Sequence, residues 1–281
     1  MLDTAAKPGL AVTAKLNFPQ GRAHKAAAVW SNTDENLIDQ DFASLPVEIR
    51  DARALEAPPS LQEQGFTLID APLTDPRWAD ADWRRDVYVP SCVELVRRLT
   101  GASEAMSLVQ GDGIVLMRAV DATDRQGGKA SLPARFVHLD QTVEHAEAII
   151  GRVAGDSWRA RYGRAVIYNV WRSISAPPQN TPLALCDQRS VDREKLFVPG
   201  STQGSAEYGE IPYLSTEYSP AMRWCYFPGL QPHEAIVFKG VDSDRSQPFG
   251  CLHSAFDLPD PTPGAPPRRS CETRVLTLFE T

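Results

Sequence analysis

The sequence predicts a mainly β fold with flanking helices, built as a strand sandwich or barrel. The first observation is a series of short runs rich in β-branched and aromatic residues, at 113–120, 135–140, 164–174, 223–230, 234–241 and 270–279. Glycine and proline separate these runs, and many short strands divided by turns are typical of sandwiches and barrels rather than parallel α/β sheets. The second observation is that a single helical pattern, at 142–155, interrupts them. A chain of 281 residues can form one such domain, since large all-β folds often reach this size.

The first third of the chain has a different texture, which predicts a buttress or lid. Residues 1–60 are polar, with few long apolar runs. GFTLIDAPL at 65–73 is typical of a short strand that ends in a turn, and 88–102 has apolar residues at helical spacing with Gly101 as a stop. We therefore expect one domain over 1–281, with an N-terminal buttress or lid region at 1–103 and a core of strands at 104–281.

The helical pattern at 142–155 carries the usual boundary signals. Thr142 is a suitable N-cap, Glu144 and Glu147 place negative charge in the first turns, and Gly155 lies near the end. Long loops rich in proline, serine and glycine are expected at 197–210 and 257–267.

Composition and charge favour a globular protein that acts on a small-molecule substrate. Hydrophobic residues make up 42% of the chain and charged residues 23%, which is ordinary for a folded domain. A net charge of -7 gives no electrostatic reason to expect nucleic acid or an anionic membrane surface as a partner. No apolar run approaches the roughly 18 residues of a membrane span, and no signal-peptide layout is present, so we expect a cytoplasmic protein. Five cysteines without a C-x-x-C pair disfavour a disulfide framework or a structural zinc site.

The segment RFVHLDQT, residues 135–142, places two metal-capable side chains on one face of an extended chain. Side chains in a strand alternate between faces, so His138 and Asp140 point the same way. A catalytic metal needs a third ligand, and the histidines that follow this pair in the chain are His145, His233 and His253.

The contexts of these three histidines rank them. His145 lies in the predicted helix directly after the pair, and His233 lies in a turn, where an exposed histidine is the ordinary expectation. His253 lies in a short apolar run after a turn, so we expect it to stand on a strand and to be the third ligand. Two histidines and one carboxylate on one face of an octahedral iron leave three positions open, as in non-haem Fe(II) oxygenases. Dioxygen (O2) and a bidentate co-substrate can fill these positions.

An α-keto acid co-substrate with a second carboxylate requires a fixed cation at the far end of its pocket. Arginine suits this role because its planar guanidinium binds a carboxylate through two hydrogen bonds and stays charged when partly desolvated. Arg268 and Ser270 form an Arg-x-Ser pair fifteen residues after His253. Arg274 lies on the same strand face and is the alternative anchor.

Two residues of the strand at 164–174 are candidates for contact with the substrate. Arg172 could bind a substrate carboxylate, and the alternative is a surface ion pair. Asn169 is the second candidate, but a regular strand places it on the face opposite Arg172, so both could line one pocket only if the strand carried a bulge.

Several blocks of the chain, taken together, resemble the hydroxylase/desaturase family of fungal and bacterial secondary metabolism. They are HLDQT, NVWR (169–172), PLALCD (182–187), RWCYFPGLQPHEAIVFK (223–239), HSAFD (253–257) and PPRRSCETR (266–274). The resemblance covers most of the chain from about residue 40. It implies an Fe(II)- and 2-oxoglutarate-dependent oxygenase on a double-stranded β-helix, or jelly-roll, core.

The resemblance also implies roles for individual residues. His138, Asp140 and His253 match the iron-binding pattern, and Arg268 with Ser270 matches the 2-oxoglutarate site. The implied reaction is oxidation of an unactivated C–H bond of a small molecule, which could be derived from an amino acid, by hydroxylation, desaturation or oxidative ring closure. Two alternatives stay open, namely a cupin-like metalloenzyme that does not use 2-oxoglutarate and a non-catalytic partner in a biosynthetic pathway.

Overall fold

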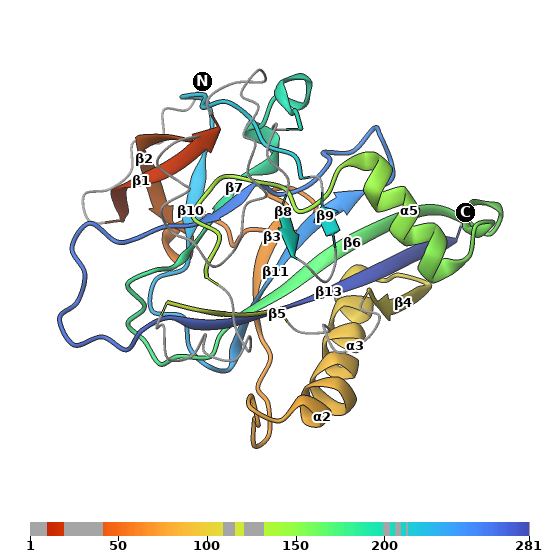
Figure 1. The fold of residues 1–281 in the computed structure, drawn as a ribbon, viewed down its shortest axis with the longest axis horizontal. Helices are drawn as coiled ribbons and strands as arrows, with labels where there is room; N and C mark the ends of the chain where they lie inside the picture. Colours follow the sequence, from red (N-terminus) through yellow and green to blue (C-terminus); the bar gives the residue numbers. More distant parts are fainter. Residues whose placement is uncertain are drawn as a thin grey trace.

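Two β-sheets form the core of the computed structural model, which describes residues 10–19, 42–108, 116–120, 132–198, 203–205, 209–211 and 213–280 (Figure 1). The first sheet has the order β1-β2-β10-β7-β12, with the strands Ala11–Pro19, Phe42–Asp51, Trp224–Tyr226, Leu183–Cys186 and His253–Ala255. The second has the order β3-β11-β6-β13-β4, with the strands Phe66–Asp70, Glu234–Asp242, Tyr162–Ser173, Arg269–Glu280 and Glu104–Ser107. β5 (Leu116–Ala119) also pairs with β13, and β8 (Gln203–Ser205) pairs with β9 (Gly209–Ile211).

The antiparallel pair of β6 and β13 is the spine of the second sheet. Because side chains alternate along a strand, each strand sends one set of residues toward the first sheet and one set away from it. In β6, Trp171 packs with residues of the first sheet such as Leu183 and Leu185. Tyr168 and Val170 pack on the other side.

The two longer helices pack against opposite faces of the second sheet. α2 (Ala81–Trp83) leads through a π-helical turn, Arg84–Tyr88, into α3 (Val89–Thr100). The buried α3 residues Val89, Cys92 and Val96 pack on the outer face of the second sheet, and Figure 1 shows α3 beside that sheet. α5 (Val143–Ala154) begins at Thr142, whose hydroxyl accepts a hydrogen bond from the backbone N–H of His145 at 3.2 Å.

The mainly β prediction is confirmed, and most predicted elements lie where expected. The runs at 164–174, 234–241 and 270–279 are β6, β11 and β13, and the two long helices are α3 and α5. α3 ends at Gly101, whose φ of 68° is the left-handed conformation that glycine adopts without strain. The run at 135–140 forms single bridges, including His138 with His253, rather than a continuous strand.

Other parts of the prediction differ from the structure. The run at 223–230 contains only the three residues of β10. Residues 113–115 of the first run, and 199–202 and 206–208 of the first expected loop, lie outside the described residues. The loop expected at 257–267 carries no strand or helix.

The sequence prediction missed β1 and β2. They lie within residues 1–60, the polar part of the expected buttress or lid. β1 and β2 are strands of the first sheet and β3 is a strand of the second, so this part of the chain belongs to the sheets themselves. In β1, buried Ala14, Leu16 and Phe18 alternate with more exposed polar residues. The strand therefore has no continuous apolar run in its sequence. The single-domain organisation and the boundary at residue 103 stay predictions.

No helix among the described residues is long and apolar enough to cross a membrane.

Candidate active site

Three buried side chains from separate parts of the chain converge at the centre of the structure. His138, Asp140 and His253 offer ligand atoms that all lie within 4.8 Å of one another. Asp140 Oδ1 is 3.8 Å from His138 Nε2 and 4.0 Å from His253 Nε2. The backbone explains this meeting, because His138 and His253 face each other across an antiparallel bridge, with N–H···O distances of 3.1 Å in both directions. The structure therefore brings together the three residues that the sequence singled out as metal ligands.

Backbone carbonyls fix the orientation of both imidazole rings. His138 Nδ1 lies 2.9 Å from the carbonyl oxygen of Phe136, and His253 Nδ1 lies 3.1 Å from that of Cys251. With the proton on Nδ1, each ring donates to its carbonyl and leaves the Nε2 lone pair free on the side of Asp140. A metal-binding histidine is commonly held in this way, through its second ring nitrogen.

The electrostatic environment favours the protonation states that bind a metal cation. Burial, together with the neighbouring His253, lowers the pKa of His138 to about 3, so this ring is neutral at pH 7. Burial opposes ionisation of Asp140, but the Arg274 cation and the two histidines outweigh it and hold the pKa of Asp140 below its usual value. A neutral imidazole and an ionised carboxylate are the forms that donate lone pairs to a divalent ion.

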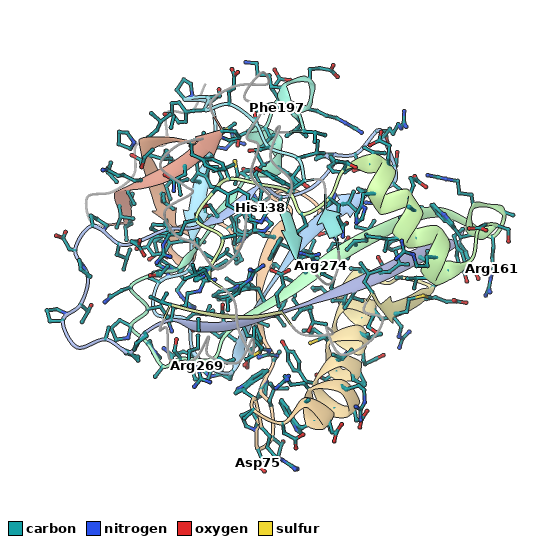
Figure 2. All side chains as sticks on the ribbon, viewed as in Figure 1. Asp75, His138, Arg161, Phe197, Arg269 and Arg274 are labelled. Carbon is teal, nitrogen blue, oxygen red and sulfur yellow. The ribbon has the colours of Figure 1, made fainter. Side chains whose placement is uncertain are left out.

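Two side chains of the β6–β13 pair hold the Asp140 carboxylate. Asn169 Nδ2 donates to Asp140 Oδ2 at 2.7 Å, and Arg274 Nη2 donates to Asp140 Oδ1 at 2.7 Å. Arg274 also donates from Nε to Glu272 Oε1 at 3.3 Å. Asn169 and Arg274 are direct cross-strand partners in the sheet register, and Figure 2 shows His138 and Arg274 near the middle of the molecule.

Aromatic rings surround the two histidines. Phe136 stacks on His138 with ring centroids 4.5 Å apart, and Phe238 lies 4.7 Å from His253. Tyr213 meets His138 edge-on at 6.4 Å. The sequence prediction missed all three residues. Phe136 could have been found because it lies two residues before His138 and so shares its face, whereas Phe238 and Tyr213 come from distant segments that give no local signal.

Arg268 is also buried, and it has no carboxylate partner in the described part of the chain. It is 4% exposed, donates from Nη1 to the carbonyl of Thr181 at 3.1 Å, and donates from Nε and Nη2 to Ser270 Oγ at 3.2 Å. Its guanidinium lies 5.0 Å from the centroid of the Trp171 ring. Burial and the nearby Arg135 and Arg118 cations lower the pKa of Arg268 to about 9. A desolvated cation held by neutral groups is a site prepared for an anion.

The structure does not bring Arg172 to this site. Arg172 lies on the outer face of the second sheet, donates from Nη2 to the carbonyl of Ala71 at 2.8 Å, and lies 5.8 Å from the Tyr88 ring. Asn169 faces inward, so the two residues lie on opposite faces, as a regular strand requires. His145 belongs to α5 and His233 is exposed in a turn, and neither joins the group around Asp140.

Comparison with known proteins gives the family. A family model described as "Oxidoreductase/YMDC permease-like domain" matches residues 16–278. The chain belongs to this oxidoreductase family. One relative is the "Hydroxylase/desaturase efuI" of Hormonema carpetanum, 29% identical over 99% of this chain and 98% of its own length. Another is the "Fe(II)/2-oxoglutarate-dependent dioxygenase nvfI" of Aspergillus novofumigatus, 27% identical over 83% of this chain and 82% of its own length.

A solved structure shows the same fold. A variant of the iron and alpha-ketoglutarate-dependent endoperoxidase NvfI matches with a TM-score of 0.80 and 22% sequence identity, over 99% of this chain and 100% of that chain. The predicted jelly-roll type of fold is thereby confirmed. The expected membership of the hydroxylase/desaturase family of Fe(II)/2-oxoglutarate-dependent oxygenases is also confirmed, by the family model and these relatives together.

Proposed function

We propose that this family member uses Fe(II), 2-oxoglutarate and O2 to oxidise an unactivated C–H bond of a small molecule of secondary metabolism. The observation that carries the proposal is the buried group of His138, Asp140 and His253, in a protein that also buries an arginine, Arg268, with no carboxylate partner among the described residues. The names of two relatives, nvfI and the "Alpha-ketoglutarate-dependent dioxygenase phiK", support the same chemistry.

The donor set fits ferrous iron. Two imidazole nitrogens and one carboxylate oxygen suit a divalent transition metal and leave a face open for further ligands. Each Nδ1 is bound to a backbone carbonyl, so the Nε2 atoms, which lie 3.8 and 4.0 Å from Asp140 Oδ1, are the ring nitrogens that can donate to the metal. The three ligand atoms already lie within 4.8 Å of one another, so a metal ion can bind them without rearrangement of the backbone.

Fe(II) held by His138, Asp140 and His253 would, with 2-oxoglutarate and O2, supply the oxidant, with one oxygen atom going to succinate as carbon dioxide is lost and the other to oxidation of the substrate. We assign to Arg268 and Ser270 the binding of the distal carboxylate of 2-oxoglutarate. The guanidinium supplies the positive charge, and the Ser270 hydroxyl, which accepts from it, can donate its own proton to the same carboxylate. Stacking on Trp171 holds the plane of the guanidinium.

Arg268 is preferred to Arg274 as this anchor. Arg274 already donates to Asp140 and Glu272, so its cation is paired with two carboxylates. Arg268 has no such partner within the described structure, and its buried charge is stabilised when an anion arrives. The same difference favours an oxygenase over a metalloenzyme without 2-oxoglutarate, which has no need of a buried unpaired cation.

The aromatic rings around the histidines shield the reaction from water. Phe136, Phe238 and Tyr213 are 0%, 0% and 1% exposed, so water reaches the metal ligands poorly from these sides. Exclusion of water protects a reactive oxidant from side reactions.

The test is turnover. The protein is incubated with Fe(II), 2-oxoglutarate, air and a panel of amino acids, peptides and terpenoid acids, with His138→Ala as the control. We expect succinate together with a product that has gained one oxygen atom or lost two hydrogen atoms, and no succinate from the variant. Product formation that needs no 2-oxoglutarate, or that survives His138→Ala, would contradict the proposal.

A further inference from the structure

We propose that Asn169 and Arg274 act as positioning residues that clamp the Asp140 carboxylate from both sides and make it a single-oxygen metal ligand. This inference rests on the proposed function, since it concerns the same metal site. It gives two residues, which the sequence suggested for substrate and co-substrate, a different role.

The clamp is built from one rung of the β6–β13 ladder. Asn169 and Arg274 are paired in register, so their side chains leave the sheet next to each other on the same face. Asn169 donates to Oδ2 and Arg274 to Oδ1, each at 2.7 Å. One donor on each oxygen prevents rotation of the carboxylate about its Cβ–Cγ bond, which neither donor could do alone.

The two hydrogen bonds decide which oxygen meets the metal. Asp140 Oδ1 is the oxygen within 4.0 Å of both His138 Nε2 and His253 Nε2, so it completes the three-atom face. Oδ2 is engaged by Asn169 and directed away. A carboxylate held in this way cannot turn its second oxygen to the same ion, and the three remaining positions stay open for co-substrate and O2.

Both clamp residues are themselves held. Glu272, on the same face of β13, accepts from Arg274 Nε at 3.3 Å and anchors the guanidinium at its other end. Asn169 is 0% exposed, and Gly240 in the bulge of β11 leaves just enough room for it. A Cβ at Gly240 would lie 3.0 Å from Asn169 Oδ1, so an alanine there would push the amide by a few tenths of an ångström. Gly240→Ala therefore perturbs the clamp without altering any group that contacts Asp140.

The test measures metal binding by the full-length protein, with Co(II) as the probe and without 2-oxoglutarate. Loss of a partner that orients a metal ligand typically weakens metal binding roughly 10- to 100-fold, and we expect this loss for Arg274→Met and for Asn169→Ala. The visible absorption of bound Co(II) should also change, because an unclamped carboxylate can bind through two oxygens. Gly240→Ala should shift both quantities in the same direction, and it keeps the test valid if Arg274→Met fails to fold.

Two comparisons separate the possible results. Arg172→Met removes an arginine that is more deeply buried than Arg274, at 2% against 21% exposed, from the other face of the same strand pair. It should leave the Co(II) affinity and spectrum of the folded protein unchanged. In the double variant of Asn169 and Arg274 the losses should not add, since both residues act on one carboxylate. Wild-type Co(II) affinity and spectrum in all clamp variants would overturn the clamp. If His138→Ala also bound Co(II) normally, the metal site itself would fail instead.

Discussion

Replacement of Arg268 by methionine should separate co-substrate binding from metal binding and from stability. In the folded protein the pKa of Arg268 falls from the usual value of an arginine to about 9, mainly through burial. At about 1.4 kcal/mol per pKa unit, this fall means that the charged form of Arg268 is destabilised by about 5 kcal/mol when no anion is bound. The hydrogen bonds to Thr181 and Ser270 offset part of that cost, at about 1.5–3 kcal/mol for a bond to a charged group. We therefore expect the free energy of unfolding of ligand-free Arg268→Met to be equal to that of the wild type or higher.

The affinity for 2-oxoglutarate should change in the opposite direction. Removal of one partner from a buried, hydrogen-bonded charge pair costs about 2–5 kcal/mol, which corresponds to an increase in Kd of about 30- to 4000-fold. Anaerobic calorimetry with Fe(II) present measures this Kd, and urea unfolding of the ligand-free protein measures stability. The affinity for Co(II) should be unchanged, because Arg268 contacts none of the three metal ligands.

Two control variants decide whether Arg268 or Arg274 binds the distal carboxylate of 2-oxoglutarate. Arg268→Lys keeps the charge but loses the two-point geometry, so its Kd should lie between those of the wild type and Arg268→Met. A Kd for 2-oxoglutarate within about twofold of the wild type in Arg268→Met would refute the reasoning. A large loss in Arg274→Met with none in Arg268→Met would transfer the anchor to Arg274.

Three further outcomes are expected. Between about pH 3 and 6.5 the free energy of unfolding of the metal-free protein should rise with pH, and His138 should contribute at most about 1.4 kcal/mol per pH unit. The reason is that His138 has a pKa of about 3 in the folded protein, whereas in the unfolded chain it still binds a proton in this window. Urea unfolding of His138→Gln should lack this part of the slope. Gly250→Ala should destabilise the fold by roughly 1–3 kcal/mol, since its Cβ would lie 2.3 Å from the Gly240 carbonyl oxygen, as thermal unfolding will show. Thr142→Ala should cost about 1 kcal/mol through the lost N-cap of α5, measured by urea unfolding, with metal affinity intact.

Each of these outcomes can fail in a defined way. An equal slope in His138→Gln would mean that another group titrates in that window. An unchanged melting temperature in Gly250→Ala would mean that the two glycine backbones are not in tight contact. Weaker metal binding in Thr142→Ala would mean that α5 acts on the site as well as on stability.

The grouping of His138, Asp140 and His253 could be predicted in part because it depends on local geometry. A period of two places His138 and Asp140 on one face whatever the rest of the chain does. Strand periodicity could not select His253, because it lies far from this pair in the sequence. Its position in a short apolar run favoured it over His145 in a helix and His233 in an exposed turn.

The contacts that Arg274 and Asn169 make with Asp140 could not be predicted, because they depend on strand register. Arg274 meets Asp140 only because β13 pairs with β6 so that Arg274 lies opposite Asn169. A sequence pattern gives the face of a residue on its own strand but not its cross-strand neighbour, which the packing of distant segments determines. For the same reason Phe238 and Tyr213 gave no signal, although both lie against the histidines.

The missed strands have a different cause. β1 and β2 pair along their whole lengths, from Ala11 with Arg50 to Pro19 with Phe42. Their apolar positions are spaced by polar residues and include alanine, so neither strand forms the continuous apolar run that marked the others. Pairing between two such strands stabilises both, and neither sequence reveals it alone.

The most direct test of the central claim is an anaerobic titration of 2-oxoglutarate into the metal-free protein, with and without one equivalent of Fe(II). If the two histidines and Asp140 hold the ion beside Arg268, one equivalent of 2-oxoglutarate will bind tightly when Fe(II) is present and much more weakly when it is absent. Equal binding in both titrations, or no binding in either, would contradict the account.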